Sequence, residues 1–213
     1  MSAFGASGAR VITIDRQADA GRQRALTLRA AGIEAFSHAC DLTDERALAV
    51  VMLEVAAQAP NGVHALVHAA GGFSASGPVA ESNPDVWHQQ LAINLTTAYL
   101  ATRAFLPLVR QARGSIVYFG SAAALPGAGV AELSAYAVAK TGVLTLMRAV
   151  AGEERATGVR ANALAPTAIR TATNIATMGD DARYVERQTV AHWVLYLTDP
   201  SSGPVTGQTF KLG

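Results

Sequence analysis

The feature that most constrains the fold is an alternation of short apolar runs with longer stretches of helical periodicity, which continues through most of the chain. Strands that are separated by helices pair in parallel, and helices then cover both faces of the sheet. The expected strands are 9–15, 35–40, 63–69, 115–119, 160–165 and 209–212, and the expected helices are 18–31, 43–59, 84–112, 134–157 and 181–198. The sequence therefore predicts a doubly wound α/β fold with a parallel sheet, in which ligands bind beyond the carboxyl ends of the strands.

The composition is that of one domain spanning residues 1–213. Half of the residues are apolar, which allows one sizeable core in a chain of 213 residues. Seventeen basic residues against sixteen acidic ones give a net charge of +1, with no basic run that would indicate nucleic acid or an anionic membrane as a partner. Glu54 and Arg103 interrupt the longest apolar stretches, and no charged leader precedes an apolar segment. We therefore expect no membrane span and a cytoplasmic location.

The single cysteine and the histidines give no sign of a metal centre. Cys40 has no partner for an internal disulfide and no neighbouring ligands, so we expect a small buried apolar side chain. His68 ends an expected strand without clustered carboxylates or thiols, and we interpret it as a hydrogen-bonded structural group. No metal site is predicted.

Tyr136 and Lys140 are the first candidates for chemistry. They are four residues apart in an expected helix, so the phenol and the ammonium lie on one helical face. A nearby positive charge favours the phenolate and would lower the tyrosine pKa from its ordinary value of about 10, which suits a general acid or base. Taken alone, the pair also fits a solvated lysine beside a half-buried tyrosine. Two further polar residues accompany it: Ser121 follows the strand expected at 115–119, and Asn94 stands in an otherwise apolar helical run.

With Asn94, Ser121 and the run from Tyr136 to Lys140 in this order, the chain resembles the short-chain dehydrogenase/reductase family over nearly its whole length. The resemblance implies a Rossmann-like fold. It also implies a NAD(P)-dependent oxidoreductase that interconverts an alcohol and a ketone, or reduces a related polarised double bond. The alternative is a catalytically impaired relative that binds dinucleotide poorly and acts through assembly or binding.

The same resemblance assigns a role to each of the four residues. It implies that Ser121 binds the substrate oxygen and that Tyr136 is the general acid/base. It further implies that Lys140 lowers the tyrosine pKa and holds the nicotinamide ribose, and that Asn94 anchors a water molecule of a proton relay.

Residues at several strand ends match positions at which this family contacts its dinucleotide. Asp15 stands where an acidic residue receives the ribose hydroxyls of the adenosine. A carboxylate repels a 2′-phosphate, so NAD is favoured over NADP, although Arg16 beside it could bind a phosphate. By resemblance, the remaining contacts are Asp41 and Leu42 at the adenine, Ala69, Ala70 and Gly71 in a turn of small residues, Tyr136 and Lys140 at the ribose, and Pro166, Ile169 and Thr171 at the carboxamide.

Residues 1–8 stand where the family has a strand, a glycine-rich turn and a helix that holds the pyrophosphate. Gly5 and Gly8 do not match such a turn, because they precede a strand instead of following one, and we interpret residues 1–8 as the last turn of that helix. We therefore expect the fold to lack its first strand and helix, with a gap in the sheet between strands 9–15 and 63–69. The flanking strands could close up, another segment could fill the gap, or the natural protein begins further upstream.

The resemblance also implies a small-molecule substrate and a homo-oligomer, either a dimer or a tetramer. Only residues 172–183 separate the carboxamide turn from the last expected helix, with Gly179 and Asp180 as a hinge-like pair. A lid this short closes little of the site from water, so either the substrate is small or the pocket stays open.

Overall fold

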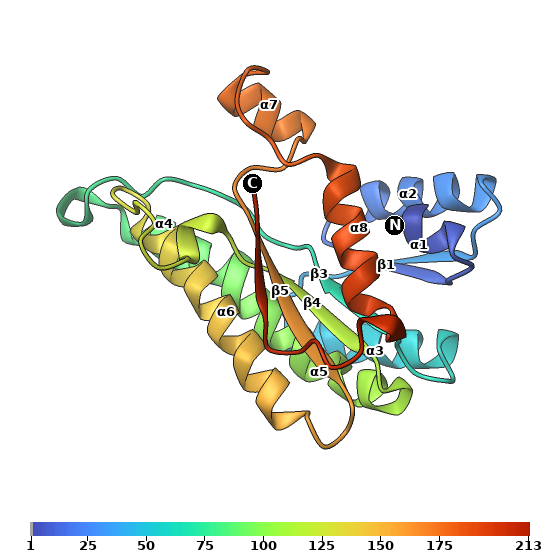
Figure 1. Ribbon diagram of the computed structural model, residues 1–213. Helices are drawn as coiled ribbons and strands as arrows, with labels where there is room; N and C mark the ends of the chain where they lie inside the picture. Colours follow the sequence, from blue (N-terminus) through green and yellow to red (C-terminus); the bar gives the residue numbers. More distant parts are fainter. Residues whose placement is uncertain (1) are drawn as a thin grey trace.

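The computed structural model describes residues 2–213, and its six strands are all parallel to their neighbours. β1 (Val11–Asp15) and β2 (Ala35–Ala39) form a two-stranded sheet, whereas β3 (Ala65–His68), β4 (Ser115–Phe119), β5 (Arg160–Pro166) and β6 (Thr209–Leu212) form a four-stranded sheet in that order. Helices separate most of the strands, as Figure 1 shows. The predicted α/β fold with a parallel sheet is therefore confirmed.

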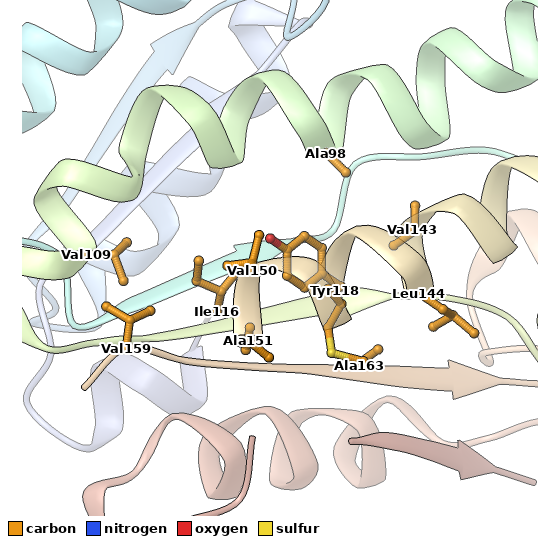
Figure 2. Packing of buried hydrophobic residues seen from close by; sticks show 12 residues of the cluster. Ala98, Val109, Ile116, Tyr118, Val143, Leu144, Val150, Ala151, Val159 and Ala163 are labelled. Atoms are coloured by element: carbon orange, nitrogen blue, oxygen red, sulfur yellow. The ribbon is translucent and has the colours of Figure 1, made fainter. Parts of the chain in front are cut away.

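Alternating side chains of the central strands pack on opposite faces of the four-stranded sheet. Ile116 and Tyr118 of β4 pack with residues of α5 (Thr97–Ala112) and α6 (Ser134–Glu153), as Figure 2 shows in part. Val117, the residue between them, packs instead with α8 (Arg187–Thr198). Because both faces are covered, β4 is a continuous apolar run without polar alternation. The remaining helices are α1 (Ser2–Ala6), α2 (Ala18–Ala30), α3 (Glu45–Gln58), α4 (Pro84–Leu91) and α7 (Ala172–Met178).

The expected helices differ from the structure at their ends or in their interior, and the helix expected at 134–157 ends at Glu153. Asp44 caps α3 by accepting the backbone N–H groups of Arg46 and Ala47, so the helix begins two residues later than the expected start at 43. The expected helix 84–112 is divided by a π-helical segment, Ala92–Thr96. The last helix begins at Arg187 instead of 181, because Val185 forms an isolated parallel bridge with Ile169.

The gap expected in the sheet is present. β1 and β3 are not hydrogen-bonded to each other, so the flanking strands have not closed up, and no other segment of residues 2–213 pairs with either open edge. Ile12, Ile14 and Leu66 pack against one apolar cluster of α3 and α5, which places both open edges over the same helices. Residues 2–6 are helical and Gly5 lies against Ile33, in agreement with our interpretation as a helix end. Met1 lies outside the described residues.

Within residues 2–213, no helix combines the length and the apolar character that crossing a lipid bilayer requires.

Candidate active site

Tyr136 and Lys140 lie on one face of α6, as their spacing predicts. Lys140 is buried, with 6% of its surface exposed, and its Nζ donates a hydrogen bond to the Phe119 carbonyl oxygen at 3.0 Å. The same Nζ lies 5.9 Å from the centre of the Tyr136 ring. The helix thus holds a phenol and an ammonium beside the carboxyl end of β4.

Burial governs the pKa values of both groups. Loss of water raises the pKa of the Tyr136 phenol, and hydrogen bonding by the Ser121 hydroxyl opposes that rise. Burial lowers the pKa of the Lys140 ammonium to about 8. The net shift of the Tyr136 pKa is upward in this state of the chain, because desolvation outweighs the Ser121 hydrogen bond. The role of Lys140 in favouring the phenolate stays a prediction.

Ser121 is positioned by the end of β4. Its backbone remains extended and its hydroxyl accepts the N–H of Ala123 at 3.2 Å, which starts the short 3₁₀ turn Ala122–Ala124. The side chain is buried and hydrogen-bonds with the Tyr136 phenol, although the two residues are fifteen positions apart in the sequence. The two hydroxyl groups that the sequence pairs are thus brought to one place.

Asn94 connects the π-helical segment to the turn after β3. Its side chain, 1% exposed, donates to the Gly72 carbonyl at 2.9 Å and accepts the Gly72 N–H at 3.2 Å. The Asn94 amide also donates to the backbone carbonyl and side-chain oxygen of Gln90, at 3.1 and 3.2 Å. A role for Gln90 was not predicted from the sequence. Its position, as a polar residue one helical turn before Asn94, could have indicated it. π-Helical segments of one turn frequently accompany functional sites.

Gly71 is the point where Asn94 and Lys140 converge. A Cβ atom at Gly71 would lie 2.7 Å from Asn94 Oδ1 and 3.3 Å from Lys140 Nζ, and the φ of +151° also disfavours a side chain. A side chain at position 71 would therefore collide with these two polar groups, whereas glycine lets a ligand approach the backbone closely. Ala69 and Ala70, before it, are exposed.

The residues present fit the nicotinamide and ribose end of a dinucleotide. Lys140 is a buried ammonium with three donors and a single protein acceptor, the Phe119 carbonyl, among residues 2–213, so it can donate to a ribose hydroxyl. Pro166 ends β5 at the same edge of the sheet. The Ile169 carbonyl is less available to a carboxamide than expected, because it already accepts hydrogen bonds from Thr171 N–H and Asn174 Nδ2, both at 2.8 Å. Thr171 caps α7 by accepting the N–H of Asn174.

The candidate contacts to adenosine lie at the ends of β1 and β2. The Asp15 side chain is exposed and accepts the N–H of Gln17 at 2.9 Å. Asp41 accepts both the N–H and the hydroxyl of Thr43, which lowers the pKa of its carboxyl, and half-buried Leu42 follows it. For the pyrophosphate, residues 2–213 offer no glycine-rich turn between a strand and a helix, so the fit to a dinucleotide is limited to its two ends.

His68 and Cys40 have structural roles. His68 is buried, with its Nε2 3.0 Å from the Thr102 hydroxyl and its ring stacked on Tyr118, and burial lowers its pKa to about 4. This agrees with our interpretation as a hydrogen-bonded structural group. Cys40 is 5% exposed and packs in the cluster beneath β1. In residues 2–213, no three His, Cys, Asp or Glu side chains come together as metal ligands would.

Phe73 is a further residue that the sequence did not single out. Its ring meets the Tyr136 ring edge to face, with the centres 5.0 Å apart and the planes at 83°. The side chain is nevertheless 61% exposed. An apolar surface therefore stands open beside the candidate acid/base.

Comparisons with known proteins agree with this geometry. The family model described as enoyl-(acyl carrier protein) reductase matches residues 2–212. A galactitol 2-dehydrogenase (L-tagatose-forming) of Cereibacter sphaeroides is 34% identical, over 96% of this chain and 84% of that protein. A protein of Xanthobacter autotrophicus named inactive 2-(S)-hydroxypropyl-CoM dehydrogenase 2 is 31% identical, over 97% of this chain and 94% of its own length.

Among solved structures, an actinorhodin polyketide ketoreductase variant with NADPH superposes with a TM-score of 0.88 at 26% identity. The superposition covers 99% of this chain and 88% of that one. The chain belongs to the short-chain dehydrogenase/reductase family of NAD(P)-dependent oxidoreductases.

Proposed function

We propose that this chain interconverts a secondary alcohol and a ketone, with Tyr136 as the general acid/base. The observation that carries the proposal is the convergence of a half-buried phenol, a buried ammonium and a buried hydroxyl at the carboxyl end of β4. Burying an ammonium that has no carboxylate partner lowers the stability of the fold. The presence of such a group beside a phenol therefore favours a role in chemistry.

Each side chain has a distinct part in this proposal. The nicotinamide supplies or accepts the hydride when the cofactor is bound. Tyr136 gives its proton to the substrate oxygen during reduction and takes it back during oxidation. Ser121 donates a hydrogen bond to the same oxygen, and a neutral phenol raised in pKa by burial is held in the donor form that reduction needs.

Lys140 and Asn94 support that proton transfer. Lys140, with a pKa of about 8, is mostly protonated at neutral pH and stabilises negative charge as it develops on the phenol. Asn94 fixes the turn at Gly72 through two hydrogen bonds, which holds the neighbouring Gly71 against Lys140. We assign Asn94 to positioning this turn and the relay.

The test of the mechanism is Tyr136→Phe, which removes the proton and keeps the ring. We expect turnover to fall by about 10²–10⁴-fold, the range for a general acid/base. Tyr99→Phe, at a half-exposed tyrosine of α5, is the matched control and should keep full turnover. Equal turnover of Tyr136→Phe and the unaltered chain would remove the mechanism.

We also propose that NAD is preferred over NADP. Asp15 supports this, because an exposed carboxylate at the end of β1 can accept ribose hydroxyls and repels a 2′-phosphate. Titrating NADH and NADPH into the chain, followed by nicotinamide fluorescence, should give the lower Kd for NADH, and Asp15→Ala should narrow the difference. Tighter binding of NADPH would refute the preference, and binding of neither would favour a protein that acts without the dinucleotide.

A homo-oligomer is the third part of the proposal. Trp87 of α4, Tyr99 of α5 and Val138 of α6 are exposed apolar side chains on three helices of the same half of the molecule. Exposed apolar surface of this kind marks protein contacts. Light scattering after size-exclusion chromatography would give the mass, and a monomer would contradict the proposal.

The single buried cysteine is consistent with a cytoplasmic location.

A further inference from the structure

Three segments follow the carboxyl ends of the central strands, on the side of the sheet where the candidate acid/base lies. They are 69–78 after β3, 121–131 after β4 and 172–178 in α7 beyond β5. The carboxyl ends of parallel strands lie at one edge of the sheet, where ligands of such folds bind. None of these segments contains an Asp, Glu, Lys, Arg or His residue. The chain that follows these strand ends is thus uncharged over all three segments.

The charged side chains next to these segments in the sequence, and Lys140 of α6, have partners or are exposed. Arg170, just before α7, pairs with Asp180 at 2.5 Å and lies 3.9 Å from Glu186. Lys140 is buried behind Gly71 and bonds to Phe119. Glu132, which follows the second segment, is exposed and uses its backbone carbonyl to accept from Ser76. Of these cations, Lys140 is assigned to the ribose and the Tyr136 phenol, and Arg170 is paired with carboxylates, so neither is left to bind a charged group of the substrate.

Phe73 is held in place although its ring is exposed. On one side, both backbone groups of Gly72 are hydrogen-bonded to the Asn94 side chain. On the other side, Ser76 N–H donates to the Glu132 carbonyl at 2.8 Å and the Ser76 hydroxyl lies 3.1 Å from that of Ser134. A large apolar side chain fixed at both flanks and left open to solvent is preorganised to receive an apolar group. Its contact with Tyr136 places that group next to the reacting oxygen.

We propose that the substrate is an uncharged ketone, or the corresponding secondary alcohol, with an aryl or branched alkyl group that packs on Phe73. The inference rests on the proposed function and names the substrate class of the same site. In the reduction, the carbonyl carbon receives the hydride and the carbonyl oxygen receives the Tyr136 proton, which yields the neutral alcohol. A carboxylate, phosphate or sulfonate on the substrate would lose its hydration without gaining a cation, so such substrates are disfavoured.

The first experiment compares two ketones that differ in charge and little in shape. The chain is assayed with NADH and NADPH for reduction of 4-methylacetophenone and 4-acetylbenzoate. We expect kcat/KM to be at least about 10-fold higher for the neutral ketone. Equal values, or a higher value for the carboxylate, would overturn the inference and leave the oxidoreductase proposal intact, because turnover itself would have been observed.

The second experiment tests Phe73 directly. Phe73→Ala should lower kcat/KM for 4-methylacetophenone by about 10-fold or more, the usual effect of removing an apolar contact from a binding pocket, mainly through a higher KM. Phe73→Leu should restore most of it, because leucine keeps an apolar side chain at this position. Val79→Ala, at a more exposed apolar residue of the same loop, is the matched control. Full activity of Phe73→Ala on 4-methylacetophenone would refute the role.

A binding measurement separates failure of the inference from failure of the proposed function. Saturation-transfer NMR on the chain with each ketone reports contact without turnover. We expect a signal from the aryl protons of 4-methylacetophenone that is lost in Phe73→Ala and is weak for 4-acetylbenzoate. If turnover is absent and this pattern is present, the substrate class stands and the catalytic proposal fails. If neither ketone gives a signal, the substrate inference fails.

Discussion

Replacing Lys140 by Met should make the chain more stable and less active. The Lys140 pKa falls from 10.5 to about 8 because the ammonium is buried. At about 1.4 kcal/mol for each pKa unit, this shift corresponds to roughly 3 kcal/mol of unfavourable free energy at neutral pH. Met fills similar space without charge but leaves the Phe119 carbonyl unpaired, which costs about 1 kcal/mol. The net expectation is a gain of about 2 kcal/mol in the free energy of unfolding at pH 7.

The pH dependence of this gain identifies its cause. Between about pH 8 and 10.5 the unfolded chain holds the lysine proton and the folded chain has lost it, so the stability of the unaltered chain rises with pH there. The advantage of Lys140→Met is therefore complete below pH 8 and disappears towards pH 10.5. Tyr136 is the titratable side chain that lies against Lys140. Its pKa is raised, so the phenol remains neutral over most of this pH range and its charge does not affect the comparison.

Urea unfolding of the chain and of Lys140→Met at several pH values between 7 and 10 measures the effect. Lys211→Met is the control, since Lys211 is exposed and is the other lysine of the sequence. Turnover of Lys140→Met should fall by at least about 100-fold, as for loss of a group that assists proton transfer. A variant that is less stable at pH 7, or whose stability difference does not change with pH, would refute the reasoning.

Four further substitutions probe an ion pair, the turn at the site and a helix cap. Arg110→Met should lower the free energy of unfolding, because it leaves the carboxylate of Glu154, 1% exposed, without its two guanidinium hydrogen bonds. Half of the Arg110 side chain faces solvent, which reduces the loss. Glu154→Gln should make the free energy of unfolding depend less on pH below pH 5. The Glu154 pKa is lowered in the folded chain, so its contribution to stability is lost as the pH falls, and glutamine does not titrate. Gly71→Ala should abolish turnover while changing stability by less than about 3 kcal/mol, because the new Cβ displaces Asn94 from its contacts. Asp44→Ala should cost about 1 kcal/mol as a lost helix cap, and thermal denaturation would measure it beside Glu45→Ala.

The order of the strands and the neighbourhood of the site could be predicted because both depend on short-range patterns. β4 and β6 have the bounds expected from the sequence. In β4 the apolar run is buried on both faces and ends where that burial ends. Tyr136 and Lys140 share a face because any helix brings residues four apart together. The resemblance in motif order then placed Ser121 and Asn94 near them.

What could not be predicted depends on contacts between distant residues. The direction of the Tyr136 pKa shift follows from how deeply the phenol is buried, which no spacing along the chain reports. The π-helical segment at Asn94 accompanies contacts to Gly72, twenty-two residues earlier. Likewise Phe73 lies sixty-three residues before the tyrosine ring it meets, and the segment expected to be a polar lid contains the helix α7.

The gap between β1 and β3 leads to a prediction for amide hydrogen exchange. In a parallel pair, one residue directs both backbone groups to its partner and the next directs both away. Val11 N–H donates to Glu34 and Asp15 carbonyl accepts from Cys40, so the residues of β1 that face away from β2 are Ile12 and Ile14. In β3, the bond from Ser115 N–H to His64 leaves Ala65 and Val67 facing the gap.

The amides of these four residues should exchange quickly, although each lies inside a strand. All four side chains are only half-buried, whereas Ile116 and Val117 of β4 are fully buried, so water reaches the open edges. Amides that face the paired side, such as Thr13 and Leu66, should be protected by at least 100-fold more because they must open before they exchange. This period of two along both strands is the signature of an unpaired edge. Uniform protection along β1 and β3 would mean that a partner strand fills the gap in solution.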